Sequence, residues 1–501
     1  MKSPAFRESR IGYHSRCGER GVTMVLVALA MVAIIAMAAL SIDVITLYLA
    51  REEAQRSADA AALAGARVIS LSGMTGDPNN TATWGAICGG SGSPATQTAT
   101  AVGMQGAVGG TVANTVTVNY SVGTNSAVPD CTTLPAAFGI NPIVTVHLSK
   151  ASLPTFFSRI WGGAGNSVSA TAAAEVFNPS NSGSVAANII PVQPSCVKPW
   201  IVPNHDPWNP GVHKGVYCDQ TGNNPGQCNT LVNTSDGSIT TKGISLEGGS
   251  PGTGVIGETF WLVSDCHYTG SACNLRDNPV LANHGQTGHI QGPYNLEYLP
   301  GQTVNPSSAV PSCGSVGSGG SADYEPAIAG CDQSTLYQCG VQNNNSGQAP
   351  MVDLSENPAT SGDTTNGVQC LIHEGDPTDR QPDGQDALSP YAAPGAYPFQ
   401  ILAGSSSPLG LSGNPITASN SIVSVPIYDD AKATYKLGAT GTTSVTIVGF
   451  LQVFINAVDQ DGNVSVTVLN VAGCSNGKGG AVSSSPITGT SPVPIRLITP
   501  P

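Results

Sequence analysis

One segment of the chain has the residue pattern of a serine nucleophile. Residues 248–252, Gly-Gly-Ser-Pro-Gly, fit the Gly-x-Ser-x-Gly sequence of serine hydrolases. That chemistry needs a strand before the serine and a helix after it, because the sharp turn between them raises the hydroxyl toward a histidine. Here glycine and serine surround Ser250, and Pro251 follows it directly. The composition therefore predicts a chance match in a loop.

Several histidines lie close enough in sequence to contribute metal ligands. The two groups are His205-Asp206 with His213, and His284 with His289. A catalytic zinc site needs three converging protein ligands, and the chain has no His-Glu-x-x-His sequence. It also lacks Cys-x-x-Cys, the usual spacing of a structural zinc site. We therefore expect neither a metal nor another cofactor.

Two acidic segments have the oxygen ligands that calcium prefers in flexible loops. In the second, residues 459–463 begin like a calcium-binding loop, with Asp459, Asp461 and Asn463 at alternate positions. Its glycine comes at the fourth position instead of the sixth, and Asn470 stands where such a loop has its glutamate. We expect solvated turns in both segments. The first segment carries Asp376, Asp379, Asp383 and Asp386.

Thirteen cysteines indicate a disulfide framework. Cys17 precedes the long apolar run of the chain and should stay reduced, whereas the other twelve follow that run. An even number of cysteines in an exported segment is typical of disulfides formed in an oxidising compartment. Spacing alone leaves the connectivity open. The short-range pairs that we predict are Cys88–Cys131, Cys218–Cys228, Cys266–Cys273 and Cys331–Cys339.

The overall composition is that of a loop-rich, strand-favouring extracellular protein. Glycine and proline, 60 and 37 residues, are more frequent than the usual ~12% for the two together, and only 10% of residues are charged. The formal net charge is -13. Binding to nucleic acid needs basic clusters, which are missing after the first twenty residues, so we exclude it.

The elements that must position these residues begin with an uncharged run from Gly21 to Ile42. At 1.5 Å per residue a helix of that length spans about 33 Å, enough for a bilayer core of roughly 30 Å. The first twenty residues have five basic and two acidic side chains, a net +3, which leaves -16 for the remainder. Basic flanks stay on the cytoplasmic side, so we expect a single-pass inner-membrane protein with a cytoplasmic N-terminus and a periplasmic or extracellular body.

A cleaved signal peptide is the alternative to a retained anchor. Residues 36–38, Ala-Met-Ala, offer a small-x-small cleavage pattern. However, the run is longer than the ~7–15 apolar residues usual in a signal peptide, and no helix breaker follows the site. We therefore predict a retained anchor; in either case the bulk of the chain is exported.

The helix should continue to about Ile69, since neither glycine nor proline occurs between Asp43 and Gly65. Small residues recur on one strip of it at helical spacing. Such a strip lets two backbones approach closely, so it could pack against a second copy or a partner. The other interpretation is an ordinary alanine-rich helix of high propensity. The strip comprises Leu47, Ala50, Ala54, Ala58, Ala61 and Gly65.

Four short sequences follow one another along this helix: Glu19–Gly21, Ser41–Val44, Leu47–Arg51 and Gln55–Ala66. In this order they resemble the TadG-like group of Tad/Flp pilus-assembly proteins, and the last is the most specific. Weaker matches lie at 155–162, at 168–172, at 423–430 and in the hairpin after Val445. The resemblance implies an inner-membrane-anchored protein with an exported body, linked to assembly or anchoring of thin adhesive pili of the type IVb kind.

The chain departs from that family in two ways. Pilin-like relatives have a glutamate shortly after the glycine at which they are processed, but Gly21 is followed by Val-Thr-Met-Val-Leu. This makes cleavage by a prepilin peptidase doubtful. Longer TadG proteins often carry a von Willebrand A-type domain with an Asp-x-Ser-x-Ser metal sequence, which is missing here. Adhesion through such a metal site is therefore not supported.

Period-two alternation predicts strands at Val112–Val122, Ile143–Leu148 and Ser167–Phe177, and a hairpin in which Val445–Ile455 and Val464–Val468 flank a turn. We expect a loop at Gly73–Gly110 and a short helix at Pro154–Ile160. The fold class is therefore α+β: a transmembrane helix with an alanine-rich extension, a small α+β module, and a β-rich, disulfide-containing domain. The expected units are a cytoplasmic stub (1–20), an anchor (21–49), a TadG-like module (50–178) and an exported domain (185–501).

We therefore predict a non-enzymatic membrane protein of pilus assembly or anchoring, acting through helix packing and protein contacts with envelope proteins or a second copy. The alternatives are a tethered hydrolase or calcium-dependent binding module, which would need His205, Asp206, His213 or the acidic loop to converge, and a minor pilus subunit processed at Gly21. The residues expected to insert and pack, with no catalytic role, are Gly21, Asp43, Ala58, Asp59, Ala61, Ala62 and Gly65.

Overall fold

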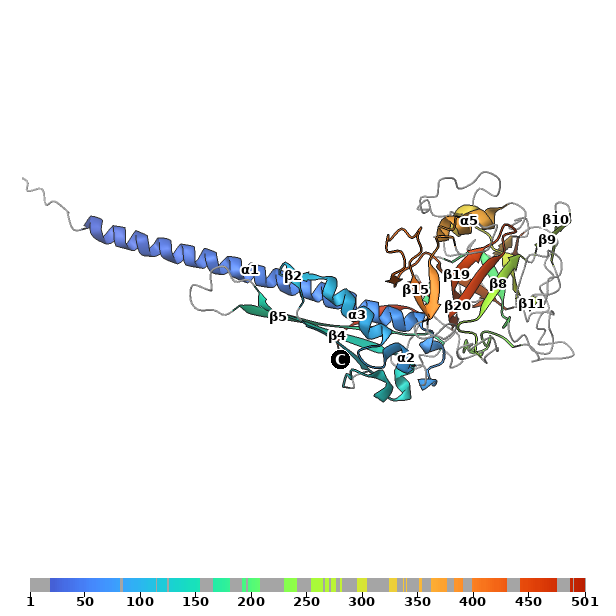
Figure 1. Cartoon of the computed structure of the whole chain (residues 1–501), viewed down its shortest axis with the longest axis horizontal. Coiled ribbons are helices and arrows are strands. Elements are labelled where there is room, and N and C mark those ends of the chain that lie inside the picture. Colours follow the sequence, from blue (N-terminus) through green and yellow to red (C-terminus); the bar gives the residue numbers. More distant parts are fainter. Residues whose placement is uncertain are drawn as a thin grey trace, which may run out of the picture.

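The computed structural model of the chain has an elongated shape, with a rod at one end and a globular module at the other (Figure 1). The N-terminal module lies between them, along the rod. The description below covers residues 19–81, 84–113, 115–123, 126–153, 165–180, 192–194, 197–207, 229–240, 254–264, 266–269, 272–275, 280–281, 295–303, 324–330, 337, 339, 351–353, 362–375, 383–390, 399–429, 442–474, 487–489 and 491–500.

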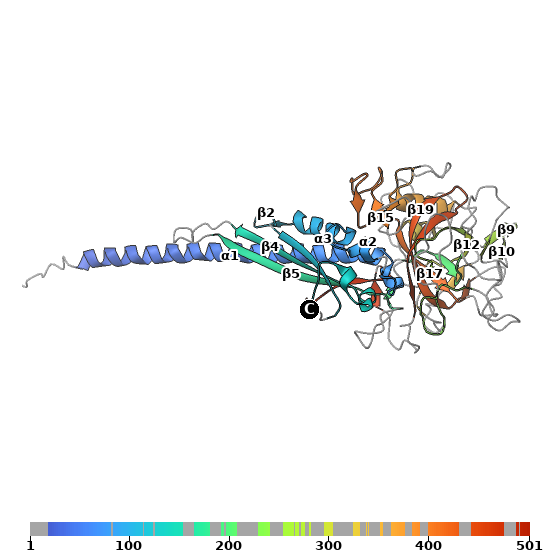
Figure 2. The same ribbon diagram turned by 60° about the horizontal axis from the view of Figure 1, so that its bottom comes forward.

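The rod is α1, a helix of 53 residues from Glu19 to Leu71. At 1.5 Å per residue it is about 80 Å long. Its first half projects alone, and its second half lies along the N-terminal module (Figures 1 and 2). The described part of the chain contains one helix that is long and apolar enough to cross a membrane, and it is this one. The predicted helix through the apolar run and its alanine-rich extension is confirmed.

The N-terminal module packs α1 and α3 (Pro94–Gln105) against an antiparallel four-stranded sheet of order β22-β5-β4-β3. Alanines and valines from the sheet's inner face and from both helices form one core cluster. The three predicted strands of this module are confirmed, with shifted ends. Their observed bounds are β3 (Thr115–Ser121), β4 (Ile143–Leu153) and β5 (Asn166–Val176).

The expected loop at 73–110 is wrong, because this segment folds into helices and a hairpin. Ser93 and Pro94 supply the N-cap position and first turn of α3, and the alanines of α3 then pack against α1. Tertiary packing thus outweighs the low helix propensity of its threonines. The predicted helix at 154–160 lies outside the described residues. The short elements of this module are η1 (Met74–Gly76), α2 (Trp84–Cys88), β1 (Ala107–Val108), β2 (Thr111–Val112), η3 (Cys131–Thr133) and η4 (Ala136–Gly139).

The C-terminal module is built on a sheet of order β11-β12-β7-β17-β19-β20-β8, in which β12 also pairs with β8. That additional pairing closes six of the strands into a barrel. The barrel is mixed, since β12–β8 and β17–β7 are parallel and the other neighbours antiparallel. Its strands are β7 (Trp200–Pro203), β8 (Thr259–Ser264), β11 (Val280–Leu281), β12 (Asn295–Pro300), β17 (Ile422–Tyr428), β19 (Ile447–Val458) and β20 (Val464–Gly473).

The predicted hairpin is confirmed as β19 and β20, but both faces of it are buried. Helices α4 (Tyr324–Ala329) and α5 (Asp363–Ile372) join the cluster formed by the barrel strands. Smaller sheets surround the barrel: β6 (Val192–Pro194) with β21 (Ile487–Gly489), β9 (Cys266–Thr269) with β10 (Ala272–Leu275), β13 (Met351–Asp353) with β18 (Thr442–Ser444), and β14 (Ala387–Pro390), β15 (Phe399–Leu402) and β16 (Pro415–Ile416) together.

The last strand of the chain returns to the N-terminal module. Strand β22 (Ile495–Ile498) pairs antiparallel with β5 and completes that module's sheet. Arg496 Nε donates to Glu175 Oε2 at 3.0 Å, and its guanidinium also lies over the ring of Phe177. The predicted boundaries put residues 185–501 in one domain. No local sequence pattern reveals that β22 pairs with β5, more than 300 positions earlier in the chain.

Candidate functional site

The surroundings of α1 change at Ala50, where the helix enters the N-terminal module. Between Val22 and Leu49 nearly every large apolar side chain is exposed, whereas Ala54, Ala58, Ala61, Ala62 and Ala66 are fully buried. One helix therefore presents an apolar surface to its environment in its first half and forms part of a protein core in its second. Gly21 lies at the start of the exposed half.

Asp43 is the first charged residue after the apolar run, and it is only 6% exposed. One turn later Thr46 Oγ1 donates to the Asp43 carbonyl at 2.9 Å. Both residues line a cavity of about 230 Å³ whose walls also include Leu47, Ala50 and Leu153. The aspartate thus lies where the exposed half of α1 meets the module.

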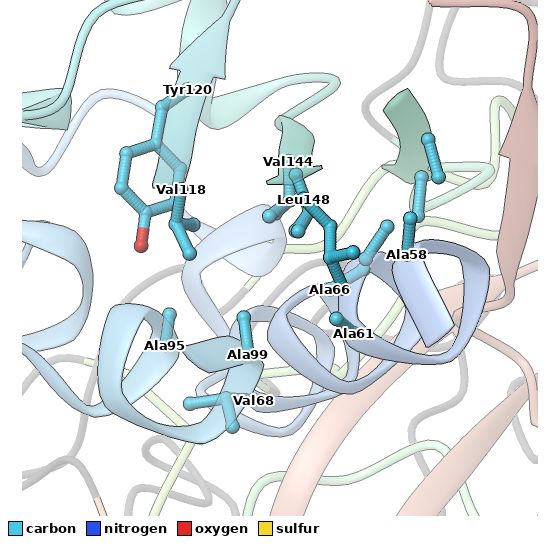
Figure 3. Packing of buried hydrophobic residues seen from close by; sticks show 14 of the residues in the cluster. Ala58, Ala61, Ala66, Val68, Ala95, Ala99, Val118, Tyr120, Val144 and Leu148 are labelled. Carbon is cyan, nitrogen blue, oxygen red and sulfur yellow. The ribbon is translucent and has the colours of Figure 1, made fainter. Parts of the chain in front are cut away.

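The small-residue strip of α1 packs within the chain itself. A Cβ atom at Gly65 would lie 3.1 Å from both Ala99 Cβ of α3 and Val144 Cγ1 of β4. Ser57 Oγ donates to the Gly103 carbonyl of α3 at 2.9 Å, at the same interface. Figure 3 shows Ala58, Ala61 and Ala66 facing Ala95 and Ala99 of α3 and Val144 and Leu148 of β4.

This packing decides between the two interpretations of the strip. Ala58, Ala61 and Ala62 are fully buried by the chain's own sheet and α3, so no face remains there for a partner helix. Asp59 lies beside the strip and accepts a hydrogen bond from Gln55 Nε2 at 2.9 Å. The same amide donates to the Thr171 carbonyl of β5 at 3.2 Å. The strip therefore positions the sheet on α1.

A hydrogen-bond network that sequence reasoning missed joins the end of α1 to the C-terminal module. Asn470 Nδ2 of β20 donates to the Ser70 carbonyl at 2.8 Å and to Gln452 Oε1 at 2.7 Å. Ser70 Oγ donates to the Val493 carbonyl at 3.0 Å. The available signal was the amide side chains of Gln452 and Asn470, which lie within two largely apolar strands.

His205 and Asp206 follow β7 and are both 1% exposed. The carboxyl of Glu258, which directly precedes β8, lies close to Asp206. Burial, followed by the nearby Asp206 carboxylate, raises the pKa of Glu258 to about 10. His213, His284 and His289, and the serine motif at 248–252, lie outside the described residues. Among the residues that the structure describes, no three metal-binding side chains gather.

The 459–463 turn is built around its first aspartate and is not solvated there. Asp459 is 1% exposed, and its Oδ1 accepts hydrogen bonds from the backbone N–H groups of Asp461 and Asn463. Its Oδ2 accepts from Asn463 Nδ2 at 2.9 Å. The carboxylate therefore closes the β19–β20 turn, and the expectation of a solvated turn is wrong at this residue.

The first acidic segment is described only from residue 383 onward, so Asp376 and Asp379 lie outside the described residues. Asp386 is buried, with Oδ1 accepting from the Gly404 N–H at 2.9 Å and Oδ2 from Ser419 Oγ at 2.5 Å. Its carboxylate holds two loops together. The expectation of a solvated segment is therefore wrong for Asp386.

Two disulfides link described cysteines. Cys88, at the end of α2, is joined to Cys131 of η3, as predicted. Cys339 is joined to Cys474 across 135 positions, so the predicted pairing of Cys339 with Cys331 is wrong. The reason is the barrel, because its strand β20 carries Cys474 to a residue remote in sequence. In addition, α5 contains a disulfide-bonded cysteine, Cys370.

The other two predicted pairs remain predictions. Cys218 and Cys228 lie outside the described residues. In the β9–β10 hairpin, Cys273 pairs with Tyr268 and Cys266 with Leu275, so the two cysteines are not directly opposite one another.

Comparison with known proteins places a family match on the helix just described. No curated protein and no solved structure matches the chain. The match covers residues 21–68, which are 48 of the 501 residues. It contains both the exposed apolar half of α1 and the buried alanine strip. The segment 21–68 is thus similar to the Tad family, which is described as Flp pilus-assembly TadE/G-like.

Proposed function

We propose that the chain is a non-enzymatic, single-pass membrane protein of Flp-type pilus assembly or anchoring. The observation that carries the proposal is the division of α1. Its exposed apolar half is long enough to cross a bilayer core, and its buried half is the spine of a folded module. The family match spans both halves. The helix therefore tethers the two folded modules to a membrane.

Charge and cysteine chemistry support the orientation of the tether. The net +3 of the first twenty residues favours a cytoplasmic N-terminus. Both modules contain disulfides, Cys88–Cys131 in one and Cys339–Cys474 in the other, and such bonds persist in oxidising compartments. We therefore place the folded modules on the periplasmic or extracellular side.

The modules act through protein contacts in this proposal. Three buried polar side chains of the C-terminal module, Asp459, Asp386 and Asn470, make structural hydrogen bonds. The rigid connection between α1 and the C-terminal module would hold that module at a fixed height above the membrane. Partners would be other envelope or pilus proteins.

The test is intact mass and N-terminal sequence of the protein recovered from membranes and from sheared filaments. An unprocessed chain confined to the membrane fraction supports the tether. A new N-terminus after Gly21, with material in the filaments, would instead make the chain a minor pilus subunit. A new N-terminus near Ala39 would mean that the run is a cleaved signal peptide.

A further inference from the structure

The exposed apolar surface of α1 continues for almost two turns beyond Asp43. Val44, Ile45, Tyr48 and Leu49 are each more than half exposed, with Tyr48 at 63%. The uncharged run before Asp43 already spans the ~30 Å hydrocarbon core, and the seven residues 43–49 rise about 10 Å more. The headgroup layers together add roughly 10–15 Å to a bilayer. One headgroup layer is therefore about 5–7.5 Å thick, and residues 43–49 cross it and end a few Å beyond it.

The body of the N-terminal module begins at that same height. The turn between β1 and β2 is tied to α1 by the Gly109 N–H, which donates to Glu53 Oε2 at 2.8 Å. Gly109 and Gly110 line the same cavity as Asp43, Leu47 and Leu49. No length of free helix therefore separates the headgroup layer from the module.

The part of the module nearest this level has side chains suited to a lipid interface. Val112 of β2 is 60% exposed, although it is apolar. Lys150 Nζ of β4 donates to the Val112 carbonyl at 2.8 Å, which holds an ammonium group beside that valine. Tyr48 is the amphipathic aromatic type that is enriched at membrane surfaces. In chemical type, an apolar side chain, a cation and a tyrosine match acyl-chain ends, phosphates and the interface between them.

We propose that this membrane-proximal rim, formed by Tyr48, Leu49, residues 109–112 and Lys150, lies in the phospholipid headgroup layer of the leaflet from which α1 emerges. The inference rests on the proposed tether and adds a second membrane contact to it. With α1 as its only attachment, the module could swing freely about the helix end. Contact of the rim with lipid fixes the tilt of the N-terminal module, and the C-terminal module is then held at the far end of α1.

The test places a benzophenone side chain at one position at a time in the full chain, reconstituted in vesicles of phosphatidylethanolamine and phosphatidylglycerol. The positions are Val32 in the exposed half of α1, Tyr48 and Val112 in the rim, and Leu411 as the control. Leu411 is an exposed leucine of the C-terminal module, comparable in exposure to Leu49. After irradiation, lipid adducts are measured by intact mass.

We expect lipid adducts at Val32, Tyr48 and Val112, and only background at Leu411. Adducts at Val32 but not at Val112 would support the membrane tether and overturn the proposed contact between the rim and lipid. Background at Val32 as well would overturn both the tether and the rim contact. Equal adducts at Val112 and Leu411 would show unspecific labelling of exposed positions and would also contradict the proposal. A crosslink from Val112 to a second copy, in place of lipid, would assign the rim to a protein interface.

Discussion

At the scale of single residues, burial in the C-terminal module disfavours the charged forms of Glu258 and Lys198. Glu258 directly precedes β8 and is close to Asp206, and both are 1% exposed. Lys198 is equally buried, with its Nζ donating to the carbonyls of Ile328, at 2.6 Å, and Gly330. Burial lowers the pKa of Lys198 to about 7 and raises that of Glu258 to about 10. The stability of this module should consequently depend on pH.

The sign of that dependence differs between the two groups. Between pH 4.5 and about 10, folded Glu258 keeps a proton that the unfolded chain releases, so the free energy of unfolding falls as pH rises. Between pH 7 and 10.5 the unfolded chain keeps a proton that folded Lys198 has released, so the Lys198 contribution rises with pH. The two effects oppose each other above pH 7. The decrease in the free energy of unfolding that Glu258 causes should therefore be visible between pH 4.5 and 7.

We predict that Glu258→Gln removes this fall. Each proton bound differently changes stability by on the order of 1 kcal/mol per pH unit, so the wild type should lose about 3 kcal/mol relative to the variant between pH 4.5 and 7. The measurement is denaturant unfolding of the full chain in detergent, followed by the fluorescence of tryptophans such as the buried Trp200. Parallel pH profiles for the two proteins would show that Glu258 titrates normally in the folded state.

At the scale of elements, the sequence predicted what local periodicity and length determine. The apolar run and the alanine-rich strip gave α1, and period-two alternation gave β3, β4, β5 and the β19–β20 hairpin. Helix α3 was missed because its threonines and glycine resemble a loop, and only its contact with α1 selects the helix. Strand β22 and the Cys339–Cys474 bond were missed because both depend on chain segments that are remote in sequence.

The same reasoning separates the site residues that could be predicted from those that could not. The small packing residues of α1 could be selected because small types recur at helical spacing, whereas the insertion role of Gly21 and Asp43 stays a prediction. The surface against which these small residues pack could not be predicted from the sequence. A second copy and the chain's own sheet would both require the same small side chains. The contact between Ser70 and Asn470 needed the assembled structure, because it connects the end of α1 with the barrel.

The packing of α1 on α3 can be tested with two neighbouring alanines. Ala61 is fully buried and close to Gly103 of α3, whereas Ala60 is exposed on the same helix. Ala61→Leu should destabilise the N-terminal module by about 1–3 kcal/mol through overpacking. Ala60→Leu should stay within about 0.5 kcal/mol, since leucine is also a good helix former. Equal unfolding midpoints for the two variants in detergent would mean that the strip is not packed as described.

At the scale of the whole molecule, the two modules are connected by more than the chain. β22 returns to the first sheet, and the Ser70 carbonyl, at the end of α1, has its hydrogen bond from a side chain of the barrel. The last carbonyls of a helix have no partner within the helix, so a partner from another module makes the helix end part of that module. Force on the C-terminal module would therefore be transmitted to the membrane helix.

Asn470→Ala should weaken that connection without unfolding either module. It leaves the buried Ser70 carbonyl and Gln452 Oε1 without this donor, at a cost of about 1–3 kcal/mol for each group. Because the bond to Ser70 lies between the modules, limited proteolysis should cut faster between them, and one thermal transition should separate into two. Asn420→Ala, at an exposed asparagine with one long contact to His373, is the matched control and should change neither result. If Asn470→Ala instead lowered the melting temperature of the barrel alone, the asparagine would stabilise the barrel core. In that case β22 would be the main connection between the modules.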